Sequence, residues 1–383
     1  MRKDIFNSIL ALVMAGGMLA CSKGDNKGPE NPGGPDEKYT SFYYYSYEAE
    51  DIVTAERLGV AAADFVPGAV YQYGDTLFVA NVKDNNYSVE LYSVRNKSHL
   101  GSLKQWDYNG ETQQFAGRVE AFAVSGERLY VANIASCIDV FDVVTLKFIT
   151  RIGNKNWGEN AMQLLHSHAI AVSGGYLVVR MKNRMQLYRE SDVTAEKYQK
   201  IPYYCRSGNE GFDVNNGFNS YQMVADTNGN LLVTDFGQYG NKKIQVIDTA
   251  LFAGKDNVAF VDAGKSLQLD FNPCGIALHE NRILVSASNG TLQVYDRAKN
   301  AFIKSMTGVN QYNFTKPEKL YVCGERLWVS DPNAKKVAGI RIYRNEIREY
   351  LSVKGGNAVR IIDPKNGEPL WVDVETHEIV SGF

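Results

Sequence analysis

Two histidines separated by one residue are the nearest thing in this sequence to a catalytic or metal-binding signal. In an extended segment, His166 and His168 project from the same side of the chain. Two imidazoles in that arrangement suit a metal ion or the transfer of a proton. Arg180 ends a nearby expected strand, where a charge needs a partner or water. Two ligands do not make a metal site, so we expect no metal, and these three residues are the candidates for catalysis.

A second group of polar residues stands where expected strands end. The second strand of each repeat described below ends in one of them: Asn81, Asn133, Arg180, Asp235, Ser286 and Asp331. An Asp or Asn at this place commonly caps a turn through its own side chain. Together with Glu120, such oxygens can also converge on Ca²⁺. Both interpretations stay open, and a structural ion pair is the further alternative for Glu120 and Arg180.

Aromatic residues gather in the segments that lead into the repeats. The candidate ligand contacts among them are Trp106, Tyr108, Trp157, Tyr221 and Tyr312. Flat rings flanked by amides and acids suit a sugar or another planar molecule, which stacks on one face and hydrogen-bonds along its rim. The alternative for each ring is a wedge between neighbouring sheets. The predicted ligand-binding set adds these polar residues to the rings: Asn81, Glu120, Asn133, His168, Arg180, Asp235 and Asp331.

Several enzyme signatures are absent from the sequence. It contains no Ser-x-Asp-x-Gly-x-Thr-Trp box of the sialidase kind and no Gly-x-Ser-x-Gly nucleophile elbow. It also contains no phosphate-binding loop and no dinucleotide fingerprint. We therefore expect no cofactor and favour a binding protein over an enzyme.

A long repeat positions these residues. A bulky aliphatic residue, one spacer and a valine recur seven times, with the valines at Val79, Val131, Val179, Val233, Val285, Val329 and, more weakly, Val372. Successive valines are 52, 48, 54, 52, 44 and 43 residues apart, which is the period of a four-stranded propeller blade. Apolar residues alternate at period two between Gly, Asn and Asp turns, and no stretch has a sustained helical period. The predicted fold class is all-β, a β-propeller of four-stranded blades.

The fourth repeat carries a family resemblance. Its segment 221–235 (YQMVADTNGNLLVTD), followed by 243–248 (KIQVID), resembles the consensus of NHL and YVTN-type propeller repeats. The second, fifth and sixth repeats match its core, with 140–142, 294–296 and 340–343 in the third-strand position. The resemblance covers nearly the whole chain after residue 38. It implies a propeller but says little about function, because that superfamily includes binding scaffolds, lyases and lactonases.

The number of blades depends on the chain ends. Only six repeats are complete, which leaves 39–66 at the front and about 355–383 at the back. Segment 41–47 can supply an outer strand, and 358–363 with 370–373 can supply two more. One blade built from both termini would close the ring and remove its exposed sheet edges. We therefore favour seven blades, and the alternative is six blades with additional terminal segments.

The N-terminal segment predicts export. Arg2 and Lys3 precede an apolar run over 5–19, and the Leu-Ala-Cys that ends at Cys21 resembles the cleavage site of a bacterial lipoprotein signal. An ordinary secretory signal is the alternative. Gly, Pro and charged residues then form a flexible tether. The predicted organisation is a signal peptide (1–20), the lipidated cysteine with its tether (21–38) and a single β-propeller domain (39–383).

The composition excludes some partners. The 383 residues are 44% hydrophobic and 22% charged, with a formal net charge of −2. Without a basic excess we expect no nucleic-acid partner. Without a second long apolar run we expect contact with the membrane through the lipid anchor only. Besides Cys21, four distant cysteines either form two disulfides or stay free thiols: Cys137, Cys205, Cys274 and Cys323.

Three functions stay open. The first is a lipid-anchored binding protein of the cell envelope that takes a small molecule or a glycan. It would support an uptake system, with an outer-membrane transporter or another envelope protein as partner. The second is a propeller enzyme, a lyase or lactonase that uses His166 or His168 with Arg180 and, in one version, Ca²⁺. The third is a scaffold that binds another protein over a broad face. The expected location is the outer membrane, facing the periplasm or the cell surface.

Overall fold

The chain divides into two compact units. The computed structural model describes residues 42–84, 86–135, 137–153, 164, 166–181, 185–197, 205–207, 221–236, 242–252, 257–258, 266–347, 352–354, 358–363 and 365–380. The larger unit is Tyr43–Asn345 with Thr376–Glu378. The smaller unit is Met1–Phe42, Glu346–Glu375 and Ile379–Phe383. No helix in the described part of the chain is long and apolar enough to cross a membrane.

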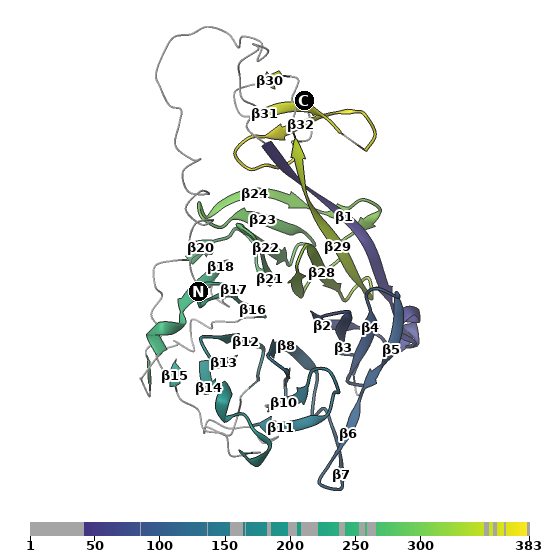
Figure 1. Ribbon diagram of the computed structural model, residues 1–383, viewed down its shortest axis with the longest axis vertical. Coiled ribbons are helices and arrows are strands. Elements are labelled where there is room, and N and C mark those ends of the chain that lie inside the picture. Colours follow the sequence, from purple (N-terminus) through teal and green to yellow (C-terminus); the bar gives the residue numbers. More distant parts are fainter. Residues whose placement is uncertain are drawn as a thin grey trace, which may run out of the picture. The chain divides into compact units, whose positions relative to one another are not determined.

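Six sheets of the larger unit stand around a common centre, as the blades of a propeller do (Figure 1). Blade 1 contains β2 (Pro67–Tyr73), β3 (Thr76–Asn81), β4 (Ser88–Ser93) and β5 (Ser98–Leu103). Blade 2 contains β8 (Val119–Ser125), β9 (Arg128–Asn133), β10 (Cys137–Asp142) and β11 (Phe148–Ile152). Blade 3 contains β12 (Ala169–Ser173), β13 (Tyr176–Arg180), β14 (Met185–Arg189) and β15 (Cys205–Ser207), with β19 (Asn257–Val258) added in parallel.

The remaining blades follow the same order. Blade 4 contains β16 (Met223–Ala225), β17 (Asn230–Phe236), β18 (Lys242–Asp248) and β20 (Ser266–Gln268). Blade 5 contains β21 (Pro273–His279), β22 (Arg282–Ala287), β23 (Leu292–Asp296) and β24 (Ala301–Met306). Blade 6 contains β27 (Leu320–Cys323), β28 (Arg326–Asp331), β29 (Lys336–Ile347) and β1 (Phe42–Thr54).

Short elements connect the blades. Two hairpins extend the loops, β6 (Gln105–Tyr108) with β7 (Glu111–Gln114) and β25 (Gly308–Val309) with β26 (Tyr312–Asn313). Short 3₁₀ turns occupy η1 (Glu56–Leu58), η2 (Ala62–Asp64), η3 (Glu190–Asp192), η4 (Ala195–Lys197) and η6 (Thr249–Phe252). All regular structure in the described residues is therefore strand or 3₁₀ turn, and the predicted all-β class is confirmed.

The second strand of each blade explains the repeat of aliphatic residue, spacer and valine. In β9, Leu129 and Val131 point to one side of the sheet and Tyr130 to the other, because side chains alternate along a strand. Leu129 and Val131 pack between blades 1 and 2, whereas Tyr130 packs between blades 2 and 3. All three are fully buried. A strand that is covered on both faces needs a continuous apolar run, and the repeat supplies it.

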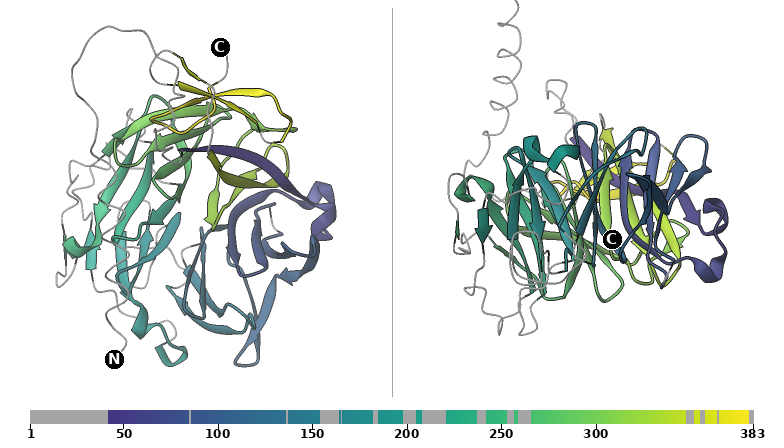
Figure 2. Two further views of the ribbon diagram at one scale, coloured as in Figure 1. Left: turned by 45° about the horizontal axis from the view of Figure 1, so that its top comes forward. Right: turned by 90° about the horizontal axis from the view of Figure 1, so that it is seen from below.

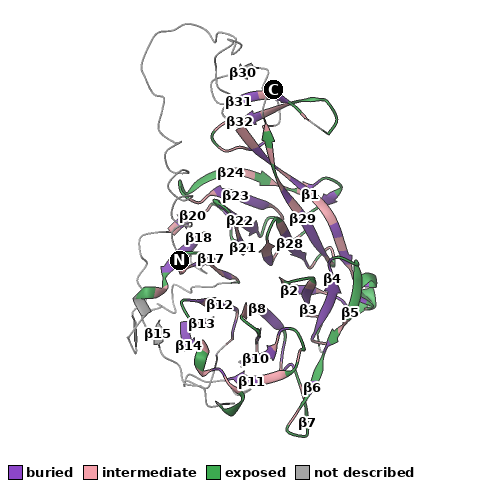
Figure 3. Cartoon of the chain, in the orientation of Figure 1, coloured by how far each residue is buried: buried purple, intermediate pink, exposed green. Residues whose placement is uncertain are grey.

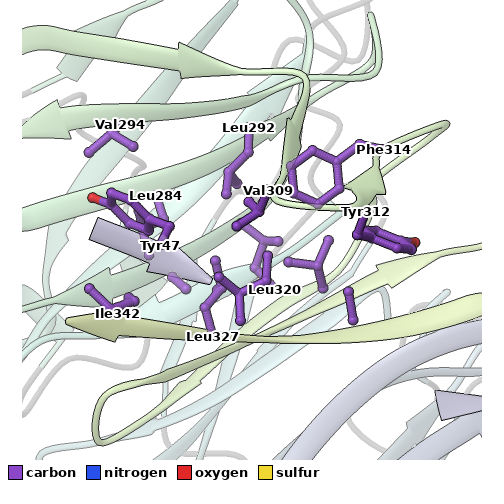
Figure 4. Close-up of a cluster of buried hydrophobic side chains, with 14 of the residues drawn as sticks. Tyr47, Leu284, Leu292, Val294, Val309, Tyr312, Phe314, Leu320, Leu327 and Ile342 are labelled. Carbon is purple, nitrogen blue, oxygen red and sulfur yellow. The ribbon is translucent and has the colours of Figure 1, made fainter. Parts of the chain in front are cut away.

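The hydrophobic core lies between the blades. The described residues form six clusters of buried side chains, one at each interface of neighbouring blades. The cluster between blades 5 and 6 packs Leu284 and Val294 against Leu327, with Tyr47 of β1 added (Figure 4). Inner strands are buried, and the outermost strands β5 and β24 are exposed (Figure 3). Burial stabilises by about 25 cal/mol per Å² of apolar surface, so contact between blades holds the ring together.

The ring closes in blade 6. Three strands come from the sixth repeat, and β1 from the N-terminal side is the outermost fourth strand. The sequence predicted a seam blade whose outer strand comes from the front of the chain. The structure confirms this outer strand, which is β1. However, β1 joins the sixth repeat and not the seventh. The structure has six blades, the alternative that the sequence left open, and the favoured number of seven is wrong.

The seventh repeat lies in a sheet of its own in the smaller unit. β30 (Ser352–Lys354), β31 (Ala358–Ile362) and β32 (Pro369–Asp373) pair there, and Ile379 forms a bridge with Val372. Of Leu370, Trp371 and Val372, only Val372 is buried. A strand inside the ring is covered on both faces, as β9 is, whereas β32 has one buried residue. β1 already supplies the fourth strand of blade 6, so the ring closes without the tail.

A C-terminal segment of the larger unit reinforces the seam. Glu378 forms a bridge with Tyr45 of β1 and is buried. Its carboxylate accepts a hydrogen bond from the Tyr47 hydroxyl at 3.0 Å and one from Nε of Arg282 at 3.1 Å. The ammonium of Lys304 lies 2.8 Å from the same carboxylate. These contacts connect β1 to blade 5 as well as to blade 6.

Candidate functional site

The strands of the propeller run between two faces of the ring (Figure 2). Pro67 at the start of β2 stands opposite Asn81 at the end of β3, and Val119 of β8 stands opposite Asn133 of β9. The first strand of each blade therefore begins where the second strand ends. We call this side the mouth face. The polar strand ends predicted from the sequence all lie on it.

A pocket of about 170 Å³ opens on the mouth face beside blades 4, 5 and 6. The Tyr221 ring stacks on the Phe236 ring, with centroids 4.2 Å apart and planes 2° apart. Phe236 ends β17, so blade 4 positions this stack. Tyr221 keeps 42% of its surface exposed. The pocket is lined by Tyr221, Phe236, Asn272, Pro273, Cys274, Ser288, Lys316, Glu318 and Lys319.

The rim of the pocket is polar and held in place. The Lys316 ammonium lies 2.6 Å from the Glu318 carboxylate, and this hydrogen bond raises the pKa of Lys316. Asn272 and Ser288 add an amide and a hydroxyl. Asp331 at the end of β28 fixes the loop, because its carboxylate accepts hydrogen bonds from the backbone N–H of Lys316 at 2.9 Å and of the preceding threonine at 2.7 Å.

Lys319 lines both this pocket and the cavity in the centre of the ring. Only 7% of its surface is exposed, and its ammonium donates a hydrogen bond to the backbone carbonyl of Tyr221. Burial lowers the pKa of Lys319, while the carboxylates of Glu120 and Glu318 act in the opposite direction. Burial also raises the pKa of the neighbouring Cys274 thiol to about 11, so this thiol is neutral at pH 7.

The central cavity has a volume of about 200 Å³ and is walled by the first strands of the six blades. Most of its lining is aliphatic or aromatic, and the charged or amide side chains are those of Glu120, Gln222 and Lys319. The Gln222 side-chain carbonyl accepts hydrogen bonds from the backbone N–H of Leu320 at 3.0 Å and of Ile276 at 3.3 Å. Gln222 thereby joins the inner strands of blades 5 and 6 at the mouth.

The two predicted histidines lie at the same mouth. Their rings are stacked with centroids 5.7 Å apart and planes 8° apart. His166 has φ 52°, so the backbone is left-handed there and not extended. The backbone N–H of His168 donates to the carbonyl of Arg180 at 3.1 Å. Strand β13 thus positions His168, and the pair faces the mouth with a strained backbone at its first member.

Burial lowers the pKa values of two residues at this mouth, His168 and Arg180. It lowers the pKa of His168 to about 3, and the positive charges of Arg180 and Lys319 add to the effect. Burial also lowers the pKa of Arg180 to about 9, opposed by the carboxylate of Asp235. His168 is therefore neutral at pH 7. A neutral imidazole of such low pKa is a weak base, but it can donate or accept a hydrogen bond from a ligand.

Within the described ranges, no three His, Cys, Asp or Glu side chains lie close enough together to hold a metal ion. The oxygens proposed for Ca²⁺ do not converge. Asp235 accepts a hydrogen bond from the Gln245 amide at 2.7 Å, and Asp331 accepts those of its own loop. Both carboxylates are fully buried in these contacts. The residues therefore do not fit the calcium site that the sequence left open.

The two predicted amides hold their own loops. Asn81 accepts a hydrogen bond from the backbone N–H of Val66 at 3.1 Å and donates one to the carbonyl of Asp64 at 2.8 Å. The Asn133 amide donates to the sulfur of Cys137 at 3.1 Å and to the carboxylate of Asp139 at 3.3 Å. Both side chains are fully buried. The geometry of Asn81 corresponds to the capping interpretation, whereas Asn133 contacts side chains of the next strand, β10.

Three predicted aromatic residues lie in the core. Trp106 stacks on Phe148 at 5.6 Å, and Tyr108 meets the same ring edge-on at 4.9 Å. The β6–β7 hairpin thus packs as a wedge on blade 2. Tyr312 belongs to the cluster between blades 5 and 6, and its hydroxyl donates to Asp331 at 3.3 Å. The predictions for Trp157 and Cys21 lie outside the described residues.

The structure places the predicted residues Glu120 and Tyr221 beside the buried Lys319. It places His166 and Arg180 beside His168, which in turn lies close enough to Lys319 to feel its charge. Sequence reasoning missed Lys319 itself and the ring of Phe236 under Tyr221. A signal for Lys319 exists, since a lysine directly before an apolar strand is placed at the mouth by the repeat. Phe236 carries no such signal, because its partner Tyr221 is distant in the sequence and the two rings meet only in the folded blade.

The cysteines near these sites are reduced. Cys137, Cys274 and Cys323 are not in disulfides, so the alternative of two disulfides loses these three members. The side chain of Cys205 lies outside the described residues. Cys274, which lines the pocket, contributes a small apolar surface there.

No protein-family model matches the sequence, and no curated protein matches it. Among solved structures, the WD40 repeats of RRP9 superpose with a TM-score of 0.51 at 9% identity, covering 78% of this chain and 100% of that chain. The β-propeller domain of Myceliophteria thermophila Cps50 (Swd1) superposes with a TM-score of 0.50 at 10% identity, covering 77% and 99%. The fold is a β-propeller. At such low identity the likeness concerns the fold alone, and the ligand of this propeller must be argued from its own residues.

Proposed function

We propose that the protein is a lipid-anchored binding protein of the cell envelope, whose propeller takes a small molecule or one unit of a glycan at the mouth-face pocket in support of an uptake system. The exposed Tyr221 ring, stacked on Phe236 beside a polar rim, carries this proposal. We also propose that the blades are of the NHL and YVTN repeat type, for which the sequence of the fourth repeat is the support.

The size of the pocket limits the ligand. Its volume of about 170 Å³ is below the range of about 300–1,000 Å³ that is usual for pockets of drug-sized ligands. It suits one sugar ring or a group of similar size, free or at the end of a longer chain. The Tyr221 ring supplies an apolar surface, and Asn272, Ser288, Lys316 and Glu318 supply hydrogen-bond donors and acceptors.

Binding measurements test this function. We expect isothermal titration of the mature protein with a panel of hexoses, uronic acids and oligosaccharides to find at least one ligand. Tyr221→Ala should then weaken binding about tenfold or more, because the stacking surface is lost. Tyr73→Ala is the matched control, since Tyr73 is 38% exposed and does not line the pocket. A ligand whose affinity is the same in both variants would place binding elsewhere.

The anchor has its own test. If Cys21 is lipidated, cell fractionation should find the protein with the membranes, and Cys21→Ala should move it to the soluble or secreted fraction. Cys323→Ala is the control, because Cys323 is a free thiol of blade 6. A Cys21→Ala protein that stays with the membranes would overturn the lipoprotein proposal. That result would not bear on the proposal that the pocket binds a ligand.

A second candidate function is the enzyme, a lyase or lactonase. The observation in its favour is the group of His168 and Arg180, both with lowered pKa, at the mouth of a cavity. The test is turnover of a ligand found in the panel, followed by product analysis. Turnover that is lost in His168→Ala supports the enzyme. Binding without turnover supports the binding protein, and failure of every small ligand alongside capture of an envelope protein supports the scaffold.

A further inference from the structure

Three cations beside Lys319 each have a carboxylate partner in the described part of the chain. Nε of Arg118 lies 2.5 Å from the Glu120 carboxylate. Lys316 is paired with Glu318 at 2.6 Å. Arg180 is stabilised by the carboxylate of Asp235.

Lys319 differs from these three cations. Among the described residues no carboxylate lies within ion-pair distance of its ammonium, which donates to the backbone carbonyl of Tyr221. An ammonium group has three donors, so a carbonyl leaves most of its capacity unused. A charge that is 93% buried (7% exposed) is costly unless a counter-ion or further hydrogen bonds stabilise it.

The location of Lys319 shows where a counter-ion can come from. Its side chain lines the mouth-face pocket and also the central cavity, which Glu120 and Gln222 line as well. The ammonium nitrogen lies 5.9 Å from the centroid of the Tyr221 ring. A group beside the ammonium and a ring beside Tyr221 can therefore belong to one small molecule.

We propose that the ligand of this pocket is a carboxylic acid, with a sugar acid as the best-fitting class, whose carboxylate binds the ammonium of Lys319 while its ring lies against Tyr221. This inference rests on the proposed function and names its ligand class. A monoanion fits better than a phosphate, because Glu120 and Glu318 lie close enough to act on Lys319 and repel a dianion more strongly.

Matched pairs of ligands test the inference. Titrations of the mature protein at pH 7 and low salt compare glucose with glucuronate and galactose with galacturonate, with glucose 6-phosphate as a further arm. We expect the acid of a pair to bind about tenfold or more tightly than its neutral sugar, which is the effect of one charge-assisted hydrogen bond. Tyr221→Ala should weaken both members of the pair.

Variants of Lys319 show whether its ammonium causes the preference for the acid. Lys319→Met should remove the preference for the acid over its neutral sugar, and Lys319→Arg should keep much of the preference. Lys335→Met is the matched control, because the Lys335 ammonium also donates to a backbone carbonyl, that of Ala62 at 2.9 Å, but does not line the pocket. Thermal unfolding of each variant shows whether it folds.

Each outcome of these titrations either supports or overturns the inference. Equal affinity of acid and neutral sugar, tighter binding of the phosphate, or a preference that survives in Lys319→Met would overturn this inference and leave the proposed function standing. Failure of every sugar and sugar acid would overturn both. If Lys319→Met does not fold, the comparison of Lys319→Arg with the parent protein and the comparison within each ligand pair still decide the inference.

Discussion

Blade 2 and blade 4 carry polar residues at equivalent positions of the mouth face and use them differently. In blade 2, Asn133 donates to Asp139 of the next strand at 3.3 Å, and Asp139 is paired with Arg151 of the outer strand at 2.5 Å. All three belong to one blade. In blade 4, the corresponding residue Asp235 also accepts a hydrogen bond from the next strand, from Gln245 at 2.7 Å, but in addition it stabilises the charge of Arg180, which belongs to blade 3.

The difference shows how one repeat position serves two roles. In blade 2 the chain of polar contacts runs outward within the sheet and fixes the blade. Around blades 3 to 6 the contacts reach across the mouth, as Gln222 does between blades 5 and 6 and Lys319 does toward blade 4. Groups that are shared between blades surround open space, and this is where the pocket lies. The following substitutions separate the two roles.

The largest effect is expected from Asp139→Ala in blade 2. The substitution leaves Arg151, whose side chain is 2% exposed, without its carboxylate, and breaking a buried pair costs about 3–5 kcal/mol. Urea unfolding should show this loss, with ligand affinity of the folded fraction unchanged. Asp107→Ala, at an exposed position of the β6–β7 hairpin, is the control and should change stability little. A loss of affinity without a loss of stability in Asp139→Ala would contradict the assignment of blade 2 to a structural role.

A mixed effect is expected from Asp331→Ala, because this residue connects the two roles. Its buried carboxylate accepts hydrogen bonds from the backbone of the loop that bears Lys316. We expect a loss of about 1.5–3 kcal/mol in the free energy of unfolding, and weaker binding because the pocket rim is no longer fixed. Urea unfolding and titration of the same preparation measure both. Unchanged affinity at reduced stability would show that the rim does not depend on this cap.

Much of the fold could be predicted from the sequence, because the second strand of every blade is buried on both faces and must be apolar throughout. The repeat at Val79, Val131 and Val285 therefore marks blades directly. The blade number was not accessible in the same way. Val372 repeats the pattern and is buried, but Leu370 and Trp371 beside it are partly exposed, and a pattern of three residues does not record how many faces of a strand are covered.

The site was partly predictable for a related reason. The repeat assigns residues such as Glu120, His168 and Tyr221 to the mouth face, because it fixes where strands begin and end. It does not say whether a polar side chain turns inward to a neighbour, as Asn81 does, or faces a cavity. That depends on contacts between distant segments, such as Tyr221 with Lys319, which no local pattern contains.

A smaller effect concerns the pH dependence of acid binding. Burial lowers the pKa of Lys319 from its ordinary value of 10.5, so the ammonium loses its charge at a lower pH than an exposed lysine. The preference for glucuronate over glucose should be complete below that pKa and be lost as the pH rises through it. The carboxylates of Glu120 and Glu318 and the guanidinium of Arg118 face the ammonium, and burial raises the pKa of the neighbouring Cys274 thiol to about 11.

Titrations with both sugars from pH 6 to pH 11 measure this dependence, and Lys319→Arg supplies the control. An arginine keeps its charge throughout this range, so the preference of that variant should stay constant with pH. A preference in the parent protein that stays equally constant beyond pH 10.5, the ordinary pKa of lysine, would mean that another cation binds the acid.

The smallest effect is expected at His168. Its pKa of about 3 keeps the ring neutral from pH 5 to pH 8, so affinity should show no step in this range, although an ordinary histidine titrates near 6.5. His168→Gln keeps a neutral side chain that donates and accepts hydrogen bonds, so we expect its affinity for the ligand to stay within about twofold of the parent value. Lys319→Met is the positive control, because we expect this substitution at the same mouth to weaken the binding of the acid. A step near pH 6.5, or turnover that disappears in His168→Gln, would show that this histidine exchanges protons with a substrate and would favour the enzyme over the binding protein.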